Sequence, residues 1–367
     1  TDIMGKFFDC KFLMEMKDRN GEKPEIFIVC SRVRGPGKTT SVCKMAMKRA
    51  IKTGEKFVLV CRKKTNVGNY AAGVLKGVAD MCGGWDVVEE TAIRGLYSNI
   101  YIQRMVDSEE EFDEDGNPKQ VKEKLAVGYV VALRGAYEIK NISSMFVDSW
   151  CSIQDEFIAQ DDSEYIKDEP VLLQNLHTSL ARGHGKSVRY YPHFMMANCV
   201  DVLNPYFIAF GMVGQIQPDT RKWRGDGIVY MRYESDVIAK EHEESPFNRA
   251  FRGYSRENDF ADNSWLVTGS SLVAKPDGSW GNPFYQYNLH MGKTWFRLAA
   301  YTNTTVYLMD YGREDGIRTF AVGEPDPGEM TWDAPGIKIR KMLRDMFKSG
   351  RLRFRSEQVK RDYMAII

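Results

Sequence analysis

The sequence predicts an α/β domain built on a mostly parallel sheet with flanking helices, followed by a smaller α+β domain. Two short apolar runs, at residues 25–32 and 56–62, are bounded by polar residues, as buried parallel strands are. Helix-like stretches follow them at about 38–52 and 67–81, and this alternation of strand and helix indicates a sheet covered by helices. From about residue 268 the pattern changes to strand alternation, which predicts the second domain.

Further strand-like runs continue the first domain. Residues 98–105 and 125–133 flank an acidic segment, 107–115, which we expect to be the solvated tip of a hairpin. The remaining strand-like runs of this domain are 145–147, 188–197 and 227–233.

The length of the chain predicts more than one domain. Its 367 residues exceed the roughly 250 to 300 that a single hydrophobic core usually supports. We expect residues 1–235 to form the first domain, 236–267 a helical linker and 268–367 the second domain. With 43% hydrophobic and 28% charged residues the composition is that of an ordinary folded chain, which excludes the disordered and low-complexity classes.

Charge and cysteine content narrow the class of protein. Lysine and arginine number 51 against 50 acidic residues, so a globally basic nucleic-acid coat is excluded although local basic surfaces are not. No apolar run reaches the roughly 18 residues that a membrane span needs. The seven cysteines lack zinc-site spacing, and we expect free thiols in a reducing compartment. These features predict a soluble intracellular protein without a membrane partner.

The strongest motif follows the first strand. The segment Arg32-Val-Arg-Gly-Pro-Gly-Lys-Thr-Thr40 fits the phosphate-binding (Walker A) pattern G-x-x-x-x-G-K-[S/T], except that Arg32 replaces the first glycine. The backbone N–H groups of such a loop hold phosphates, Lys38 reaches the β and γ oxygens, and the Thr39 hydroxyl ligates Mg²⁺. No N-K-x-D motif is present, which favours ATP over GTP. The predicted nucleotide-contacting residues of the loop are Arg32, Arg34, Gly35, Gly37, Lys38, Thr39 and Thr40.

A P-loop ATPase also needs a Walker B acid near the Mg²⁺ and a base that orients water. The segment Ile153-Gln-Asp-Glu-Phe157 offers both, with Asp155 as the metal-associated acid and Glu156 as the base. Asp148 is a rival for the first role, because the run that precedes it is more apolar. Adjacent carboxylates favour Asp155 and Glu156, since hydrolysis needs the second acid.

Four segments carry a family resemblance. They are the phosphate loop, the second strand ending in Val-Leu-Val-Cys-Arg62-Lys-Lys, the Asp155-Glu156-Phe157 segment, and Phe194-Met-Met-Ala-Asn198 followed by Asn204-Pro-Tyr-Phe207. Together they resemble the DNA-packaging (encapsidation) ATPases of small short-tailed phages, which are relatives of the terminase large subunit. The resemblance covers about residues 25–210 and implies that the first domain is a P-loop NTPase of the ASCE type.

The resemblance implies roles for two further residues. Asn198 is expected to sense the γ-phosphate and to pass hydrolysis to the rest of the domain; the alternative is an asparagine that satisfies a strand end. Arg182 is expected to reach the ATP of a neighbouring subunit, where a guanidinium neutralises transition-state charge. The alternative for Arg182 is a basic patch with Lys186 and Arg189 that faces DNA phosphates.

Terminase-like chains usually end in an RNase H-like nuclease, which needs several carboxylates around two metal ions, the first on its opening strand. The expected opening strand is 284–291, in a hairpin with 293–302. The opening strand holds Asn288 and His290 but no acid, and Asp310 on the third strand is alone. We therefore expect an RNase H-like domain with a vestigial nuclease site and no nuclease activity.

The end of the chain is strongly basic. Residues 337–367 hold ten basic and three acidic side chains, a density suited to binding a phosphate backbone, a structural RNA or a portal. Leu343, Met346 and Phe347 give part of the segment an apolar face, so we expect a packed helix. The residues predicted to contact nucleic acid are Lys186, Arg351, Arg353 and Arg355.

The leading functional hypothesis is an ATP-driven translocase of double-stranded DNA. A homo-oligomeric ring, of five subunits by resemblance, would hydrolyse ATP with Mg²⁺ and move a viral genome into a procapsid. It would act in the host cytoplasm, transiently at the portal vertex, and an RNA scaffold is left open as a partner. The alternatives are a terminase large subunit with an active nuclease and an ATP-gated protein that binds DNA or the portal.

Overall fold

The chain folds into two compact units. The first comprises Thr1–Asn198 and Arg221–Arg252, and the second Cys199–Thr220 and Gly253–Ile367. Residues 199–220, expected in the first domain, therefore group with the C-terminal part of the chain. The computed structural model describes residues 7–31, 35–112, 118–159, 164–183, 185, 188–198, 204–212, 215–216, 220–250, 272–291, 294–349 and 351–364.

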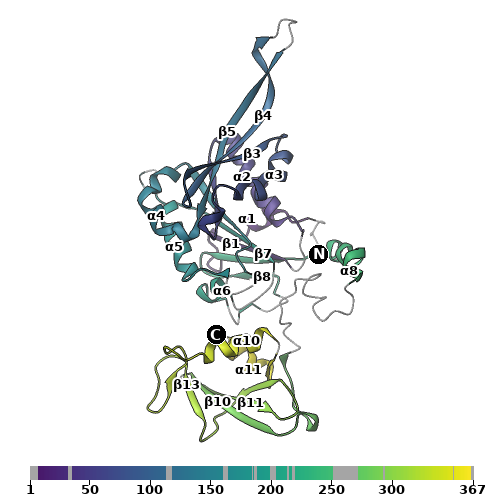
Figure 1. Ribbon diagram of the computed structural model, residues 1–367, viewed down its shortest axis with the longest axis vertical. Helices are drawn as coiled ribbons and strands as arrows, with labels where there is room; N and C mark the ends of the chain where they lie inside the picture. Colours follow the sequence, from purple (N-terminus) through teal and green to yellow (C-terminus); the bar gives the residue numbers. More distant parts are fainter. Residues whose placement is uncertain are drawn as a thin grey trace. The chain divides into compact units, whose positions relative to one another are not determined.

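The first unit is built on a nine-stranded sheet (Figure 1). Its six inner strands, β5, β2, β6, β7, β1 and β9, pair in parallel. Antiparallel strands extend the two edges, β4 and β3 beside β5 and β8 beside β9. In spatial order the strands are β3 (Asp86–Ile93), β4 (Tyr97–Phe112), β5 (Pro118–Ala132), β2 (Lys56–Cys61), β6 (Ser149–Asp155), β7 (His193–Asn198), β1 (Ile26–Ser31), β9 (Ile228–Tyr233) and β8 (Lys222–Arg224).

The order of three central strands brings distant motifs together. β7 lies between β1, which leads into the phosphate loop, and β6, which carries the predicted acids. All three strands are parallel, so their carboxyl ends meet at one edge of the sheet. The register places Ser31 beside Asn198 and Asp155 beside Met196. This arrangement confirms the predicted fold class of a mostly parallel α/β sheet.

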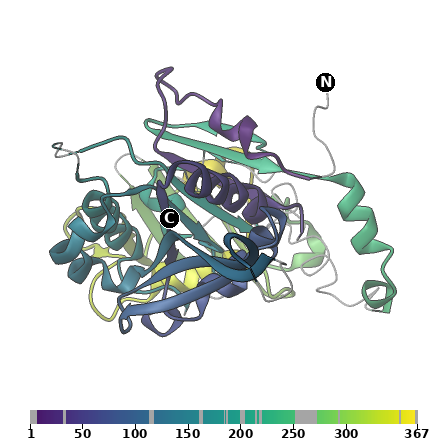
Figure 2. The same ribbon diagram turned by 90° about the horizontal axis from the view of Figure 1, so that it is seen from above.

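Helices cover this sheet, as the alternating pattern predicts. Helix α2 lies across the sheet (Figure 2) and buries Val42, Cys43, Ala46, Met47 and Ala50, whose spacing forms one helical face. In the described part of the chain no helix has the length and apolar character needed to cross a membrane. The helices of the first unit are α1 (Cys10–Met14), α2 (Lys38–Thr53), α3 (Tyr70–Met81), α4 (Ala136–Ile139), α5 (Glu169–Leu180), α7 (Asp236–Glu243) and α8 (Pro246–Ala250), with short 3₁₀ turns at η1 (Lys64–Asn66), η2 (Leu133–Gly135) and η3 (Lys140–Phe146).

One strand prediction is wrong in position. The apolar residues 145–147 end the 3₁₀ turn η3 and begin a turn, and the strand β6 starts only at Ser149. Polar residues hide this strand from a hydropathy pattern, yet Ser149 and Ser152 are buried because each is hydrogen-bonded. The Ser149 hydroxyl donates to the Phe146 carbonyl oxygen at 2.6 Å, and the Ser152 hydroxyl pairs with His193 Nδ1 at 2.7 Å.

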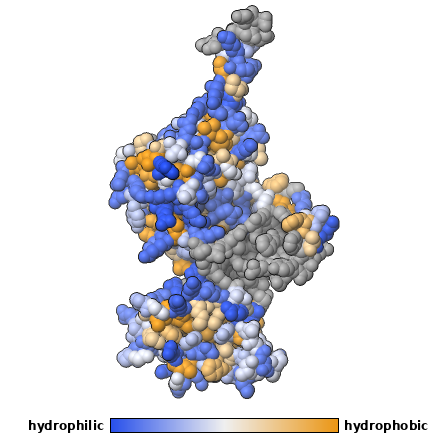
Figure 3. Space-filling view, viewed as in Figure 1, coloured by the Kyte–Doolittle hydropathy of each residue, from blue (hydrophilic) through white to orange (hydrophobic). Residues whose placement is uncertain are grey.

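The predicted acidic hairpin is present. Strands β4 and β5 pair over most of their length and extend as an arm from the sheet (Figure 1). The described side chains along the arm are mainly hydrophilic (Figure 3), with isolated apolar exceptions such as Met105, which is 58% exposed. The described parts of this arm therefore form a solvated hairpin, and residues 113–117 at its tip lie outside the described residues.

The second unit confirms the predicted smaller α+β domain. Strand β10 pairs antiparallel with β11 and parallel with β13, so the sheet is mixed. In spatial order its strands are β14 (Met330–Thr331), β13 (Arg318–Ala321), β10 (Pro283–Met291), β11 (Thr294–Tyr301), β12 (Tyr307–Tyr311) and β15 (Leu352–Phe354), and its helices are α6 (Pro205–Ala209), α10 (Ile339–Lys348) and α11 (Glu357–Met364), with the 3₁₀ turn η6 (Gly278–Trp280).

The basic C-terminal segment differs from the predicted single helix. Helix α10 buries Leu343, Met346 and Phe347, which confirms the apolar face. The chain then forms the short strand β15, which pairs in parallel with β12, before α11 begins. In this strand the buried Leu352 and Phe354 alternate with charged residues. A period of two suits a strand with one buried face and does not suit a helix.

Candidate active site

The phosphate loop leads directly into a helix. Gly35 and Gly37 have φ angles of 84° and 82°, in the left-handed region that glycine adopts without strain. Gly37 caps α2, and the Ser41 amide donates to the Gly37 carbonyl oxygen at 2.8 Å. The first amides of α2 thus face the loop, as anion binding at a helix N-terminus requires. Arg32 and Arg34 lie outside the described residues.

Lys38 is held at the carboxyl edge of the sheet. Its side chain is buried, and its Nζ donates to the Ser31 hydroxyl and, at 3.1 Å, to Asn198 Oδ1. Ser31 ends β1 and Asn198 ends β7, so the strand order itself gives the lysine its two partners. The ammonium group is thereby positioned in the loop before any phosphate binds.

Thr39 and Asp155 form the second contact between the loop and the sheet. The Thr39 hydroxyl donates to Asp155 Oδ1 at 2.7 Å, across 116 residues of sequence. Burial raises the pKa of Asp155 above its ordinary value, although the Thr39 hydrogen bond and the charge of Lys38 act in the opposite direction. A hydroxyl and a carboxylate oxygen are hard donors, which suit Mg²⁺.

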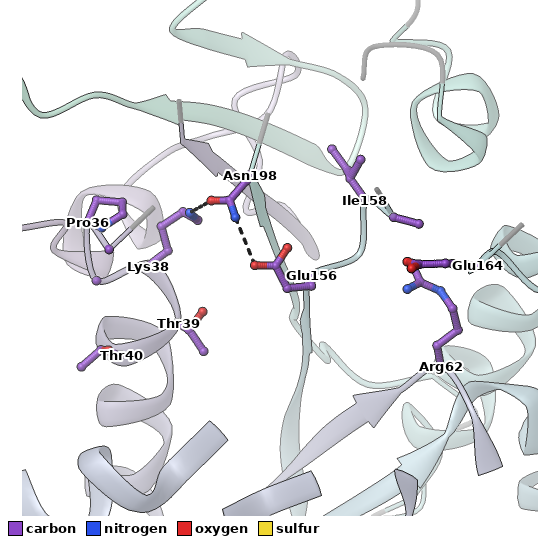
Figure 4. Close-up of a pocket in the computed structure, with 12 residues that line it drawn as sticks. Pro36, Lys38, Thr39, Thr40, Arg62, Glu156, Ile158, Glu164 and Asn198 are labelled. Carbon is purple, nitrogen blue, oxygen red and sulfur yellow. Dashed lines mark hydrogen bonds between the residues drawn. The ribbon is translucent and has the colours of Figure 1, made fainter. Parts of the chain in front are cut away.

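Glu156 directly follows this acid and turns toward Asn198. The Asn198 amide donates from Nδ2 to Glu156 Oε1 at 3.2 Å, as Figure 4 shows. Glu156 has a φ of 51°, which is rare for a residue with a side chain, and Asp168 is the other described non-glycine residue with positive φ. Such backbone strain persists where the surrounding structure fixes it, and it is concentrated at functional sites.

The rival acid lies elsewhere. Asp148 precedes β6 and therefore sits at the amino end of that strand, opposite the edge where the phosphate loop lies. There Lys56 Nζ forms an ion pair with Asp148 Oδ2 at 2.8 Å, and the Tyr129 hydroxyl donates to Asp148 Oδ1 at 2.8 Å. Asp148 thus has a structural role, and the geometry favours Asp155 as the acid beside Thr39.

Arg62 is a site residue to which sequence reasoning gave no role. It follows β2, at the same carboxyl edge of the sheet, and its Nε donates to both carboxylate oxygens of the fully buried Glu169 at 2.9 and 3.0 Å. One of its terminal nitrogens donates to the Phe157 carbonyl oxygen at 2.8 Å. The sequence could have indicated a role for Arg62, because it directly follows a predicted strand and parallel strands gather functional residues at their carboxyl ends.

These residues surround one cavity of about 520 Å³ (Figure 4). The phosphate loop forms one side, and Arg62 lies across from it. Arg182 is exposed just beyond α5 and does not line this cavity. The lining residues are Gly35, Pro36, Gly37, Lys38, Thr39, Thr40, Arg62, Glu156, Ile158, Ala159, Glu164 and Asn198.

Of the predicted nucleic-acid contacts of the second unit, Arg353 lies in β15, and Arg351 and Arg355 lie directly before and after it. Leu352 and Phe354 of β15 are buried, so Arg351, Arg353 and Arg355 alternate with them and share the opposite face. Burial lowers the pKa of Arg353 from its ordinary value, and its guanidinium stays charged. Lys186, the remaining predicted contact, lies outside the described residues.

A nuclease would need several carboxylates around two metal ions, and the sequence predicts that the second unit lacks such a set. Asp310 Oδ2 lies 3.8 Å from a terminal nitrogen of Arg297. On the opening strand, Asn288 donates from Nδ2 to the Glu314 carbonyl oxygen at 2.8 Å. Asn288 thus fixes a turn where a nuclease would carry its first acid. The absence of nuclease activity stays a prediction.

The known proteins that this chain resembles are described as phage DNA packaging proteins or motors. The DNA packaging protein of Bacillus phage B103 is 26% identical over 242 residues, a match that spans 63% of this chain and 63% of that relative. Two solved structures share the fold: the Phi-28 gp11 DNA packaging motor, with 16% identity, and the bacteriophage Phi-29 viral genome packaging motor assembly, with 18%. Their TM-scores are 0.54 and 0.51, and the alignments cover 98% of this chain and 96% and 97% of theirs.

A family profile gives the assignment. The profile of the podovirus DNA encapsidation protein (Gp16) matches residues 90–279, which is just over half of the chain. The matched range includes Asp155, Glu156, Arg182 and Asn198, and it ends before the opening strand of the second sheet. The chain therefore belongs to the podovirus DNA encapsidation protein (Gp16) family.

Proposed function

We propose that this protein is an ATP-driven motor that moves double-stranded DNA into a viral procapsid. The observation that carries the proposal is the contact set at the carboxyl edge of β1, β6 and β7. There the loop residues Lys38 and Thr39 meet Asn198 and Asp155, with Glu156 beside them. A phosphate-binding loop opposite adjacent carboxylates is what nucleotide hydrolysis requires. Relatives described as DNA packaging proteins and motors support the coupling of hydrolysis to DNA.

Lys38, Glu156 and Asn198 would have different roles in hydrolysis. Lys38 now donates hydrogen bonds to Ser31 and Asn198. When ATP binds, its ammonium group would donate to the phosphate oxygens instead. Glu156 would accept a proton from the attacking water as it orients that water, a role worth about 10² to 10⁴ in rate. Asn198 touches both Lys38 and Glu156, so displacement of Lys38 by phosphate changes what holds Glu156.

The same site fits a magnesium ion. Thr39 Oγ1 and Asp155 Oδ1 are oxygen donors 2.7 Å apart at the mouth of the loop, so Mg²⁺ would be held by Thr39 directly and by Asp155, directly or through water. When bound, the ion would neutralise charge on the β and γ phosphates. The Thr39–Asp155 hydrogen bond keeps both donors in place for it.

A second cavity offers room for the nucleoside. It has a volume of about 1030 Å³ and shares Gly35, Gly37 and Thr40 with the phosphate cavity. Its walls are mainly apolar, including Phe7, Cys10, Met14, Met45 and Met81. A flat purine is stabilised by such apolar and aromatic walls, so we place the base of ATP here.

Arg182 and the second unit would complete the motor. Arg182 is exposed outside its own cavity, which suits a guanidinium that serves a neighbouring subunit in a ring. Arg351, Arg353 and Arg355 share one face of β15 and would contact DNA phosphates without reading sequence. A motor needs such contacts because it must release every register of DNA equally well.

A packaging assay tests the proposal. Purified protein, procapsids, linear double-stranded DNA and ATP are incubated, and the DNA protected from nuclease is measured. We expect protection with ATP and its loss in Glu156→Gln protein. Equal protection by the Glu156→Gln protein would assign the base to another residue, whereas binding of DNA or procapsids without protection by the parent would favour an ATP-gated binding protein. Steady nicking of plasmid that Asp310→Ala abolishes would favour the terminase with an active nuclease.

A further inference from the structure

The second unit contains a cluster of metal-ligating side chains that the proposed motor does not use. His290 lies near the end of β10, and Asp326 and Glu329 lie between β13 and β14. One ligand atom from each of the three residues lies within 4.8 Å of the others. An imidazole nitrogen with two carboxylate oxygens is a donor set that divalent transition metals take.

The spacing of the donors fits one ion. His290 Nδ1 lies 3.0 Å from a carboxylate oxygen of Glu329 and 3.7 Å from Asp326 Oδ2. Tetrahedral Zn²⁺ with ligand bonds of about 2.0 to 2.2 Å places its donor atoms roughly 3.3 to 3.6 Å apart. The two His290 distances lie on either side of this range, and every pair of donors lies within 4.8 Å, so one ion could contact all three after local shifts.

The surrounding residues hold two of the donors in place. The His290 ring stacks on Trp295 with centroids 4.0 Å apart and planes 12° apart, which fixes the direction of Nδ1. A carboxylate oxygen of Glu329 accepts the Asp326 amide at 3.1 Å, and the Glu329 amide donates to the Asp326 carbonyl oxygen at 3.0 Å. Ligands oriented by such outer contacts bind metal more tightly.

The position in the sheet is one where ligands commonly bind. β10 and β13 are parallel neighbours, His290 pairs with Ala321, and the segment 322–329 continues from the carboxyl end of β13. The side chains of His290 and Glu329 are only 11% and 8% exposed, whereas that of Asp326 is 70% exposed. Two donors are thus shielded, and the third faces solvent, which gives an ion a route to the site.

We propose that His290, Asp326 and Glu329 bind one Zn²⁺ ion. Three protein ligands leave the fourth tetrahedral position to water or to another ligand. The ion neutralises the paired carboxylates of Asp326 and Glu329 and fastens the segment 322–329 to β10. This site shares no residue with the nucleotide cavity, and its donor set, with an imidazole, differs from the all-oxygen set that Mg²⁺ prefers.

Zinc titration of the full chain without nucleotide tests the site. We expect one equivalent more of bound Zn²⁺ than in His290→Ala, and at least tenfold weaker binding at this site in Asp326→Asn. Glu324→Gln is the matched control, because Glu324 is exposed in the same segment, lies outside the donor cluster and should bind Zn²⁺ like the parent. Thr39→Ala should also leave this binding unchanged, which separates it from the nucleotide site.

Cobalt gives a second readout that does not depend on a folded mutant. Co²⁺ in the parent protein should produce visible absorption typical of nitrogen and oxygen ligation, and one equivalent of Zn²⁺ should remove it. Equal zinc stoichiometry in the parent and the folded His290→Ala protein would overturn the proposal. The absence of a cobalt spectrum in the parent would do the same, and would leave His290 and Glu329 as a hydrogen-bonded pair.

Discussion

At the scale of single residues, the side chain of Asn198 makes two contacts that require an amide. Its oxygen accepts from Lys38 at 3.1 Å and its nitrogen donates to Glu156 at 3.2 Å. A carboxylate in its place would repel Glu156, and an aliphatic residue would make neither bond. The amide therefore links the residue expected to bind phosphate with the residue expected to orient water.

Substitution of these two partners should separate binding from turnover. Lys38→Ala should abolish tight nucleotide binding, because it removes the ammonium group that is held beside Ser31 and Asn198 at the phosphate loop. Glu156→Gln keeps the shape of the side chain and should bind ATP but lose about 10² to 10⁴ in rate. Binding of a fluorescent ATP analogue and phosphate release measure the two steps. Normal hydrolysis by Glu156→Gln would assign the base to another residue.

Among residues, sequence patterns predicted the contiguous parts of the candidate site, the family resemblance added Asn198, and Arg62 with Glu169 was missed. Lys38 and Thr39 stand in one motif, and Asp155 and Glu156 are adjacent, so spacing alone could find them. Arg62 and Glu169 are 107 residues apart and meet only because β2 and α5 are brought together by the fold. No local pattern contains that contact.

At the scale of elements, the Arg62–Glu169 ion pair joins the end of β2 to the first turn of α5. Arg62 also donates to the carbonyl oxygen of Phe157, the residue after Glu156. Arg62 therefore links the end of β2 to α5 and to the segment that follows β6. Helix α5 ends two residues before Arg182. We expect removal of the ion pair to disturb both folding and the placement of Glu156.

Glu169→Gln should lower the free energy of unfolding by about 3 to 5 kcal/mol, because Arg62 loses its buried partner charge. It should also reduce ATP turnover. Glu138→Gln is the matched control, since the exposed Lys64–Glu138 pair should contribute at most about 1 kcal/mol. Urea unfolding of both variants gives the comparison. Equal, small losses in the two proteins would refute a special role for the buried pair.

The contact between β6 and β7 should make the fold sensitive to acid. Burial, with a smaller effect of the charge of His177, lowers the pKa of His193 to about 3, so the folded chain keeps this histidine neutral. The unfolded chain takes up that proton near pH 6.5, so this contribution to stability is present above pH 6.5 and is lost as pH falls toward 3.

Replacement of His193 tests this linkage. The free energy of unfolding of the parent should fall by up to about 1.4 kcal/mol per pH unit below pH 6.5 from this one group. His193→Gln should be less stable at pH 7.5, because the contact with Ser152 changes, but should lose less stability between pH 6.5 and 5. Parallel pH profiles for the two proteins would show that another group controls the acid response.

At the scale of elements, hydropathy placed β1, β2 and the hairpin but not β6. The strands of the hairpin partly alternate, and β1 and β2 are mainly apolar, which are patterns that the sequence reveals. Strand β6 includes Ser149 and Ser152, whose burial depends on partners from distant segments. The basic segment at the end of the chain was likewise placed in one helix, whereas pairing with β12 draws Leu352–Phe354 into a strand.

At the scale of the whole molecule, the proposed motor requires residues from more than one subunit. Mixing inactive Arg182→Ala protein with inactive Glu156→Gln protein should restore part of the ATPase rate. In the mixture an intact Glu156 can meet an intact Arg182 of its neighbour. Mixed assemblies that remain as inactive as each parent would contradict a role in trans and favour a basic patch that contacts DNA.

The family and the two-unit organisation could be predicted from the sequence, because the motifs that carry them are local and their order is fixed. The grouping of residues 199–220 with the second unit was not predicted, since it depends on contacts between segments far apart in the sequence rather than on a local pattern. The proposed zinc site was not predicted from the sequence, because His290 stands 36 residues before Asp326 with three strands between them.

The central claim, that hydrolysis at the phosphate loop serves the movement of DNA, is tested most directly by ATPase rates with and without linear double-stranded DNA across a salt series. We predict that DNA raises the rate and that this stimulation fades as salt rises, because phosphate contacts release counterions. The stimulation should depend less steeply on salt in the Arg351→Ala, Arg355→Ala double variant. A rate that is the same with and without DNA at every salt concentration would contradict the account.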